Sequence, residues 1–551
     1  MLRLVPTGPF RTETFVTLSH CWGHNVQPIL TTQNIEERCE SGIPIDALPK
    51  TFQDAITVTE WFDVKWLWID CLCIIQDSKE DWLREAKMMA PNYRQALFDI
   101  SADAIEAGTS GLFQPRRAVD YLPLSFTATA LDRTTRFTPC SVNQFAWIHD
   151  APTFSRAWVH RERQLSRRIL HFTDQQMIWE CCATTGHGFA SDMVPGEPLT
   201  SRPFGADNKQ HVHGLQLAGS GGIGRDESEL HDSWDDVCHN ISQKRLTVLT
   251  DMPIVLSTLA EDFAALLHNG DQYLAGLWRW TMPRNLLWKT DHHRRLRQSP
   301  YIAPTWSWMS TACSTTFDAR KLGRSDIVHD VAEFQSADLQ YKNGNDAFGP
   351  LFRGVLTLRG YLRSLQFTFD LPSAGKQIDP CSLSVFDNDR WRTVGPRWDK
   401  RTGDLFELKL DKAHSRRQFD CSCIFISTKF WGSFESCWQE ISALLLTRNE
   451  QDEWQRIGII TFKDFYSLQV SPEFRSRLWL VKHKQLKKHQ NTFWEQHKAA
   501  KDNERADDEL GEKSEPEVWV QEPDPADLYA FDSGLDTRYL NALEPQTIVL
   551  T

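Results

Sequence analysis

Polar side chains come at the ends of two apolar segments, in positions where they could bind a ligand. Asp70 follows the run WLWI at 66–69, and Ser19 and His20 close the run FVTLS at 15–19. Apolar runs of this length are typical of strands buried in a parallel sheet. In open α/β sheets, residues just past the carboxyl ends of strands face the ligand crevice. We therefore expect Ser19, His20 and Asp70 to line a crevice, where they could contact a sugar or a phosphate.

A carboxylate and an aromatic ring lie together further along the chain. Residues 156–165 (RAWVHRERQL) are predicted to be helical. Within them Trp158 and Glu162 are one helical turn apart, so they share a face. The simpler alternative is that Glu162 pairs with Arg156 or Arg163, or stabilises the start of its helix.

Other groups of reactive side chains give weaker signals. Serine, histidine and cysteine are adjacent at 19–21, but neighbouring residues rarely point at each other, and no G-x-S-x-G motif is present. The cysteines and histidine at 181–187 lack paired C-x2-C spacing, so we expect structural thiols and no metal site. Cys71 and Cys73 are separated by one residue, and we expect them to be a buried pair with no redox role. No P-loop or G-x-G-x-x-G precedes a helix, so an ATPase or a Rossmann dehydrogenase is not supported.

The elements that would position these residues alternate between strand and helix. Such alternation favours an α/β layer with a parallel sheet. We expect the run ending at Asp70 to be the central strand. The expected order is a strand at 15–19, a helix from Pro49, a strand at 66–70, a helix at 80–93, a strand at 97–101, the helix at 156–165, and two short strands at 168–172 and 177–181.

Length, charge and cysteine content limit the class of protein. A chain of 551 residues is too long for one ordinary core. The net charge of -12 argues against non-specific binding to nucleic acid or anionic membrane. We expect neither a transmembrane helix nor a signal peptide. With 13 cysteines in no regular framework, we expect reduced thiols and a cytoplasmic protein.

Several ordered blocks of the sequence, among them LSHCWG at 18–23 and WLWIDCLCIIQD at 66–77, together resemble the fungal heterokaryon-incompatibility (HET) family. The resemblance covers about residues 10–182, and segments near Trp234, at 276–278 (GLW) and at 303–308 (APTWSW) resemble the usual downstream part of such proteins. Two positions depart from the family pattern: Arg161 stands where glutamine is usual, and Cys71 where serine is usual. The blocks are LSHCWG at 18–23, LPKTFQDAI at 48–56, WLWIDCLCIIQD at 66–77, DWLREAKMM at 81–89, GLF at 111–113, RAW at 156–158 and WEC at 179–181.

The resemblance also predicts a fold class and a division into units. HET domains are similar to Toll/interleukin-1 receptor (TIR) domains, which are flavodoxin-like α/β modules of cell-death and immune signalling. We therefore expect an α/β chain: a TIR/flavodoxin-like, parallel-sheet HET domain with a helical extension and a C-terminal β-rich unit. The expected units are the HET domain at 10–182, a flexible linker or insertion at 183–232, a helical, Trp-rich extension at 233–320, a β-rich unit at 350–480 and a charged, partly disordered tail at 482–551.

Some TIR domains cleave NAD with a glutamate four residues after a tryptophan, the spacing of Trp158 and Glu162. The resemblance thus implies a catalytic role for Glu162, with NAD as a candidate substrate and no required cofactor. Cleavage of the nicotinamide–ribose bond develops positive, oxocarbenium-like charge, which a nearby carboxylate stabilises. The implied substrate-binding residues are Ser19, His20, Trp22, Gly23, Asp70 and Trp158. The simpler alternatives are that the two tryptophans belong to the core and that Asp70 caps the next turn.

Three functions remain open at the level of sequence. The first is non-self recognition and programmed cell death through assembly of the HET domain with itself or with the HET domain of a partner. The second is an NAD glycohydrolase that depletes NAD through Glu162. The third is a non-toxic accessory protein that keeps the HET fold, which the departure at Arg161 makes worth considering. The expected partners are other HET-domain or death-signalling proteins, or a second copy of this chain, and not nucleic acid.

Overall fold

The structure is a computed structural model of the whole chain. It describes residues 1–6, 13–23, 28–105, 110–115, 126–130, 133–137, 151–174, 177–182, 189–191, 227–267, 270–290, 300–311, 313–317, 327–344, 346–369, 380–387, 390–394, 404–410, 418–432, 436–467 and 545–551. Most of the predicted linker and most of the predicted tail lie outside these residues.

The N-terminal part is built on one six-stranded sheet, with strand order β2-β1-β3-β6-β7-β8. The strands from β2 to β6 are parallel, whereas β7 and β8 are added antiparallel. The prediction of a mixed α/β fold with a largely parallel N-terminal sheet is therefore confirmed. The strands are β1 (Phe15–Ser19), β2 (Trp66–Ile69), β3 (Asp99–Ser101), β6 (Arg168–Phe172), β7 (Met177–Cys181) and β8 (Phe189–Ser191).

The strand β2 lies at the edge of this sheet, so its prediction as the central strand is wrong. Within the described sheet β2 pairs with β1 alone, and β1 lies between β2 and β3. The apolar run instead reflects packing against helices, since the Trp68 ring lies 5.7 Å from the ring of Tyr93. Trp66 and Leu67, at the start of the strand, are only half-buried.

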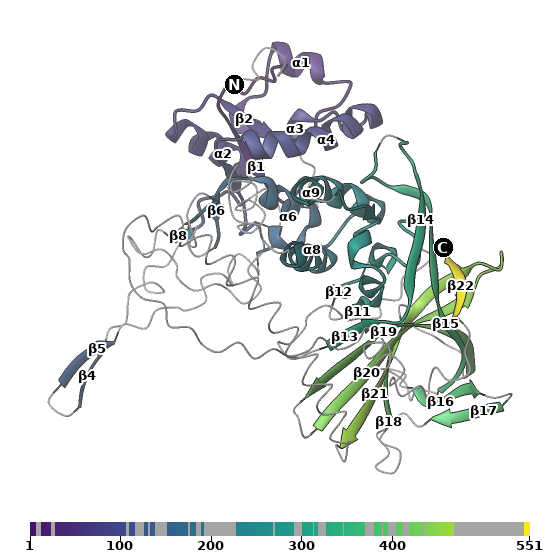
Figure 1. Cartoon of the computed structure of the whole chain (residues 1–551). Helices are drawn as coiled ribbons and strands as arrows, with labels where there is room; N and C mark the ends of the chain where they lie inside the picture. The colour runs from purple at the N-terminus through teal and green to yellow at the C-terminus, as the bar shows by residue number, and fades with distance from the viewer. Residues whose placement is uncertain are drawn as a thin grey trace, which may run out of the picture.

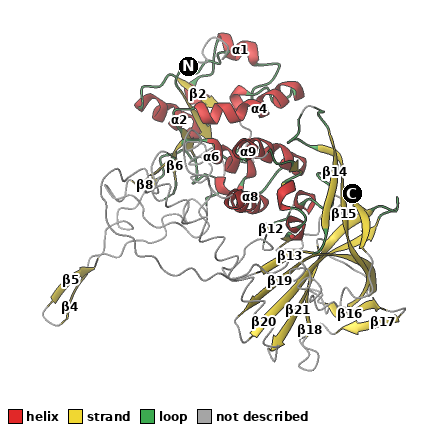
Figure 2. Ribbon diagram, in the orientation of Figure 1, coloured by secondary structure: helices red, strands yellow, loops and turns green. Residues whose placement is uncertain are grey.

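Helices cover both faces of the sheet (Figures 1 and 2). On one face, α2 (Lys50–Trp61) packs Phe52 against Val16, Leu18 and Ile100 in a compact apolar cluster. On the other face lie α4 (Lys79–Gln95) and α6 (Ala157–Leu165). The short helices α1 (Ile35–Glu40) and α3 (Asp70–Cys73) complete the connections. Both faces of the parallel strands are thus buried, as such sheets require.

The sheet face toward α6 is polar, which is unusual for a buried parallel sheet. Side chains in register across neighbouring strands share a face, and here the pairs are Thr17 with Asp99, Ser19 with Ser101, and Ser101 with His171. All five are buried. Burying so many polar groups is costly unless they bond to one another or serve a site.

Two helices downstream of the sheet, α8 (Glu227–Ser242) and α9 (Met252–Leu266), lie with α6 between the N-terminal sheet and a C-terminal sheet (Figure 1). The GLW and APTWSW segments meet beside them. Trp234 and Trp308 both donate an indole N–H to the carbonyl oxygen of Gly276, over 3.0 and 3.1 Å. Gly276 has a φ of 92°, and a Cβ there would lie 2.6 Å from Trp308 Nε1. Only glycine fits this position.

A ten-stranded, mostly antiparallel sheet forms the C-terminal part, in agreement with the predicted β-rich unit. Residues 545–550, which were expected in a charged tail, instead form a strand paired with Leu356–Tyr361 of β15. Their alternating burial explains the pairing, since Ile548 and Leu550 face the core. The strands are β13 (Ile327–Asp330), β14 (Glu333–Tyr341), β15 (Leu351–Phe369), β16 (Pro380–Asp387), β17 (Arg390–Val394), β18 (Asp404–Leu410), β19 (Gln418–Gly432), β20 (Ser436–Arg448), β21 (Trp454–Ser467) and β22 (Pro545–Leu550).

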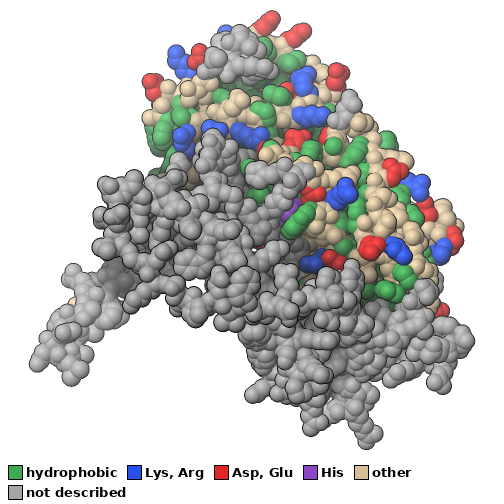
Figure 3. Space-filling view, viewed as in Figure 1, with side chains coloured by type: hydrophobic (Ala, Val, Ile, Leu, Met, Phe, Trp, Pro, Cys, Tyr) green, Lys and Arg blue, Asp and Glu red, His purple; other side chains and the backbone are tan. Residues whose placement is uncertain are grey.

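One apolar core runs from the N-terminal sheet to the C-terminal sheet. It includes Trp68 and Tyr93 at one end, Phe263 in the middle, and Leu356 and Leu444 at the other end. The N-terminal sheet therefore shares its core with the downstream helices. On the face shown in Figure 3, positive and negative side chains are interspersed over the N-terminal part. No helix among the described residues is long and apolar enough to cross a membrane.

Candidate functional site

The carboxyl ends of β1 and β2 meet the helix α6 at a buried pair of side chains. Ser19 Oγ donates a hydrogen bond of 2.6 Å to Glu162 Oε2. The two residues are 143 positions apart in sequence, and Glu162 is only 4% exposed. The order of the strands explains why these two residues meet. β1 lies beside β3, β6 lies on the other side of β3, and α6 directly precedes β6 in the chain.

A cavity of about 300 Å³ opens directly beside this pair. Of the seven predicted site residues, His20, Trp22, Asp70, Trp158 and Glu162 line it. Ser19 reaches it through its bond to Glu162. Gly23 is not among the lining residues; its φ of 67° lets the chain turn after Trp22. The other lining residues are Ile74, Gln76, Trp82, Ala86, Met89, Arg156, Val159, Thr247, Val248 and Asp251.

Asp70 holds one wall of the cavity in place. Its Oδ1 accepts the backbone N–H of Cys71 over 2.6 Å, and its Oδ2 accepts the indole N–H of Trp22 over 2.9 Å. The first bond is a local contact within the first turn of α3, whose N-cap is Ile69 and not Asp70. The second fixes the Trp22 ring at the cavity. Asp70 thus has both a structural contact and a position in the site.

Glu162 carries a strongly perturbed carboxyl group. Burial raises its pKa from the ordinary 4.5 to about 7, and the negative charge of Asp70 acts in the same direction. The Ser19 hydroxyl, the charge of Arg156 and the Tyr93 hydroxyl oppose the shift. A carboxyl group shifted by desolvation and by a neighbouring charge, inside a cavity, is typical of a functional site.

Both arginines that could have neutralised Glu162 bind elsewhere. Arg163 Nε donates to Glu180 Oε2 over 3.0 Å, and Arg156 Nη1 donates to the backbone oxygen of His20 over 3.1 Å. The simple ion-pair alternative for Glu162 is therefore wrong within the described residues. Arg156 instead places a positive charge at the cavity, where it could approach an anionic part of a ligand.

Two tryptophans form the aromatic side of the cavity. The rings of Trp82 and Trp158 meet edge to face, with centroids 6.2 Å apart and planes at 85°. Trp158 was predicted as a site residue, whereas Trp82 on α4 was not. Thr247, Val248 and Asp251, which precede or end the turn η5 (Leu249–Asp251), were not predicted either. Nothing in their spacing connects this turn to α6.

Arg161, the departure beside Glu162, points away from the cavity. Its Nη2 donates to Thr258 Oγ1 on α9 and to the backbone oxygen of Ala86 on α4. Its guanidinium carbon lies 5.4 Å from the centre of the Trp158 ring. Arg161 therefore joins three helices behind the site and leaves the lining of the cavity unchanged.

A second buried network lies beyond Glu162 on the same polar face. His171 bonds Asp103 Oδ2 over 2.6 Å and Glu180 Oε2 over 2.9 Å. Ser101 and Thr153 donate to the other oxygen of Asp103. Burial by itself lowers the pKa of His171, but the two carboxylates outweigh it and raise the pKa above the ordinary 6.5. The network therefore joins the neighbouring strands β3, β6 and β7.

Replacing His171 with glutamine should lower the free energy of unfolding by about 3 kcal/mol near pH 6, because two buried carboxylates lose a cation. A raised folded-state pKa gives stability that is fully present below pH 6.5 and is lost as pH rises through the folded value. The deficit of the variant should therefore shrink at about pH 9. Urea unfolding at both pH values measures it, and an equal deficit at both would contradict the charged role of His171.

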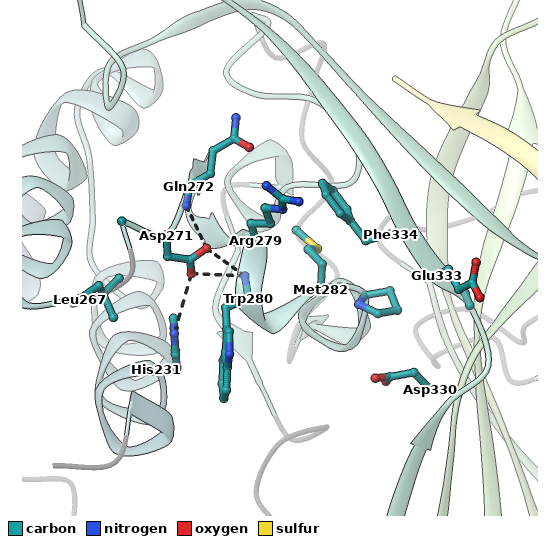
Figure 4. Close-up of a pocket in the computed structure, with 13 residues that line it drawn as sticks. His231, Leu267, Asp271, Gln272, Arg279, Trp280, Met282, Asp330, Glu333 and Phe334 are labelled. Carbon is teal, nitrogen blue, oxygen red and sulfur yellow. Dashed lines mark hydrogen bonds and ion pairs between the residues drawn. The ribbon is translucent and has the colours of Figure 1, made fainter. Parts of the chain in front are cut away.

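A larger hollow of about 540 Å³ lies outside the N-terminal sheet, between the start of α8 and the β13–β14 turn (Figure 4). Asp271 accepts the backbone N–H groups of Gln272 and Trp280 and lies 3.8 Å from His231 Nε2. The rings of His231 and Trp280 are stacked 4.7 Å apart. These contacts tie the polar groups to the local fold, and no predicted site residue lies there. We therefore place the functional site at the smaller cavity.

Comparison with known proteins identifies one part of the chain. The family model described as "Heterokaryon incompatibility protein (HET)" matches residues 15–162. The matched span runs from β1 to Glu162, so it contains all of the predicted site residues, whereas η5 lies outside it. No curated protein and no solved structure matches the chain.

Proposed function

Residues 15–162 are a heterokaryon incompatibility (HET) domain, which implies a heterokaryon-incompatibility-type protein, and from this premise we propose that the domain is an NAD glycohydrolase. The observation that carries the proposal is the convergence of Ser19, Asp70, Trp158 and Glu162 on one cavity. An ion pair that held Glu162 far from Ser19 would have argued against an enzyme. Instead, Ser19 donates a hydrogen bond of 2.6 Å to Glu162.

The order of the strands supports the flavodoxin-like, TIR-related part of the proposal. The second, first, third and fourth parallel strands lie side by side, with helices on both faces. This is the order of flavodoxin-like sheets, whose ligands bind outside the carboxyl ends of the strands at the switch between the first and third. Ser19 ends β1 at that switch.

In the proposed reaction, the chain binds the nicotinamide riboside half of NAD in the cavity. The volume of about 300 Å³ is at the low end for small-molecule sites, so the rest of the dinucleotide extends outward, past Arg156. The nicotinamide ring lies against Trp158 and Trp82. The Glu162 carboxylate faces the anomeric carbon, stabilises the positive charge on the ribose, and water completes hydrolysis. Nicotinamide leaves without a general acid.

The test uses the full chain, because α9 and η5 complete the site. Purified protein is incubated with NAD, with and without forced oligomerisation, and nicotinamide release is followed by chromatography. Toxicity of the same chain is measured on overexpression in a fungal host. The absence of NAD loss under oligomerising conditions would overturn the enzyme proposal. It would leave the cavity without its proposed substrate.

The proposed reaction should depend on pH through Glu162. Because the ionised carboxylate is the active form and its pKa is about 7, kcat/KM should rise with pH and level off above that value. Below it the rate should fall about tenfold per pH unit. Asp70→Asn removes the charge that helps to raise this pKa, so its profile should shift to lower pH. A rate independent of pH between about 5 and 9 would exclude Glu162 as the titrating group.

A second function, assembly of HET domains, is favoured by an exposed aromatic patch. Trp61, Phe62 and Phe113 are 65%, 48% and 43% exposed, and the Trp61 and Phe113 rings lie 5.2 Å apart. Clustered exposed aromatics commonly mark protein interaction sites. The patch is at the end of α2, away from α9 (Figure 1). We propose that it binds a second HET domain, of this chain or of a partner in cell-death signalling.

Replacing Trp61 with serine should weaken self-association at least about tenfold, because a large exposed aromatic is typical of an interface hot spot. The melting temperature should change little, since Trp61 is mostly solvated in the monomer. Analytical ultracentrifugation over a range of concentrations measures the effect. Leu83→Ser, at a residue 47% exposed on α4, is the matched control. Equal association constants for both variants would place the interface elsewhere.

The third function, a non-toxic accessory protein, rested on Arg161. Because this side chain bonds Thr258 and Ala86 and does not line the cavity, it gives no physical reason for an inactive site. Toxicity of the intact chain separates the accessory protein from the other two functions. The cytoplasmic location remains a prediction.

A further inference from the structure

His20 is a buried imidazole whose ring nitrogens both lack a hydrogen-bond partner. It is only 4% exposed, lines the cavity, and packs edge-on against the Phe52 ring at 5.1 Å. A neutral imidazole keeps a lone pair on one nitrogen, which can bind a cation. A buried polar group without partners is costly, so a ligand for it is expected.

Two further ligand groups lie beside this imidazole. His20 Nδ1 is 3.9 Å from Asp70 Oδ1. The ligand atoms of His20, Asp70 and Cys71 all lie within 4.8 Å of one another. His20 follows β1, and Asp70 and Cys71 follow β2, so the pairing of the two parallel strands brings the three side chains together. Sequence spacing gave no sign of this cluster, because two of its members are 50 residues from the third.

We propose that His20, Asp70 and Cys71 form a binding site for a zinc-type divalent cation at the inner end of the cavity. One imidazole, one carboxylate and one thiolate are the ligand types that Zn²⁺ takes in proteins. Three protein ligands would leave a fourth tetrahedral position open. His20 and Asp70 both line the cavity. The cation replaces the Cys71 thiol proton, which passes to solvent.

The charges around the site are compatible with a divalent cation of moderate affinity. The carboxylate and the thiolate supply two negative charges. Arg156, beside His20, opposes a second positive charge. His20 and Asp70 also line the proposed substrate cavity, but the proposal does not require NAD cleavage, since Glu162 is not a ligand.

Cobalt(II) titration of the full, reduced chain tests the site. We expect one equivalent to bind with the intense visible bands of tetrahedral coordination and a near-ultraviolet thiolate-to-cobalt band, and Zn²⁺ to displace it. Cys71→Ser should remove the thiolate band and weaken binding at least about tenfold. Cys73→Ser is the matched control, because this half-buried cysteine packs against the opposite apolar cluster and its replacement should leave both the band and the affinity unchanged. Circular dichroism confirms that each variant is folded.

A second variant keeps the test decisive if Cys71→Ser folds poorly. His20→Ala leaves both thiols in place and should also abolish the tetrahedral spectrum. Unchanged cobalt spectra in Cys71→Ser and His20→Ala would overturn the proposal, as would the absence of tetrahedral binding to the unmodified chain. Glu162→Gln should bind cobalt normally, so a failed NAD assay and a failed metal site are told apart.

Discussion

Replacing Glu162 with glutamine is expected to lower NAD cleavage at least about 1,000-fold, because the carboxylate supplies the main stabilisation of the oxocarbenium-like charge. Glutamine keeps the size of the side chain and an oxygen that can accept the 2.6 Å bond from Ser19. It also removes a group whose ionisation is unfavourable in the folded state. The variant should therefore be as stable as the unmodified chain at about pH 4, where Glu162 is protonated whether the chain is folded or unfolded, and more stable at about pH 8, because the unfolded chain ionises this group more readily than the folded chain does. Nicotinamide release and thermal unfolding at both pH values measure the two effects.

Asp99→Asn is the matched control for this variant. Asp99 is a buried carboxyl on the same polar face, where Thr17 donates to it over 2.8 Å. Burial, followed by the charge of Glu162, raises its pKa well above the ordinary value, which favours the protonated form that asparagine resembles. Its rate should stay within about tenfold of the unmodified chain. Equal losses in both variants would mean that the polar face as a whole, and not Glu162, determines the rate.

If Glu162→Gln abolished toxicity while folding and self-association persisted, assembly alone would not explain cell death. If toxicity persisted without NAD cleavage, the aromatic patch around Trp61 would become the more important surface. The two functions are compatible, because an enzyme can require assembly. The variants at Glu162 and Trp61 separate them, since one changes the cavity and the other the outer end of α2.

The site was predictable where it depends on local sequence. Ser19 and Asp70 end or follow apolar strands, and parallel pairing brings the ends of such strands to one edge. Glu162 was found through its spacing from Trp158, which a helix converts into a shared face. The edge position of β2 was not predictable in this way. A strand buried by neighbouring helices at the edge of a sheet can be as apolar as a strand at its centre, so the run WLWI does not distinguish the two positions.

The rest of the site depends on long-range packing, for which the sequence carries no local signal. Asp251 reaches the cavity because α9 packs on α4 and α6, where Arg161 donates to Thr258. Likewise, strand β22 pairs with β15 across almost 200 residues. Its six residues are too few to be told from an apolar end of a tail. In both cases the tertiary partner, and not the segment, decides the structure.

The second large effect concerns the HET domain expressed alone, as residues 1–182. We expect this fragment to lack a cooperative unfolding transition. On the face toward α6, Trp68, Met89, Tyr93 and Leu165 pack in one core with the downstream helices. Exposing a large apolar side chain costs about 1.5–3 kcal/mol. Several such losses approach the total stability of about 5–15 kcal/mol that a typical domain has.

Thermal circular dichroism and binding of an apolar dye compare the fragment with the full chain. The fragment should bind the dye strongly and melt gradually, because loosely packed states expose apolar surface. Residues 1–290, which retain α8 and α9, should restore part of the cooperativity. A sharp transition of the 1–182 fragment, close to that of the full chain, would show that the domain is autonomous.

This prediction bears directly on any enzyme assay. The fragment lacks Thr247, Val248 and Asp251, and thus one wall of the cavity. An inactive fragment would therefore say nothing about Glu162, because its loss of rate has a structural cause. In the full chain Arg161 joins α6 to α9, and burial raises the pKa of Glu162 to about 7. The downstream helices are thus expected to control the electrostatics of a site whose proposed catalytic residue lies in the HET domain.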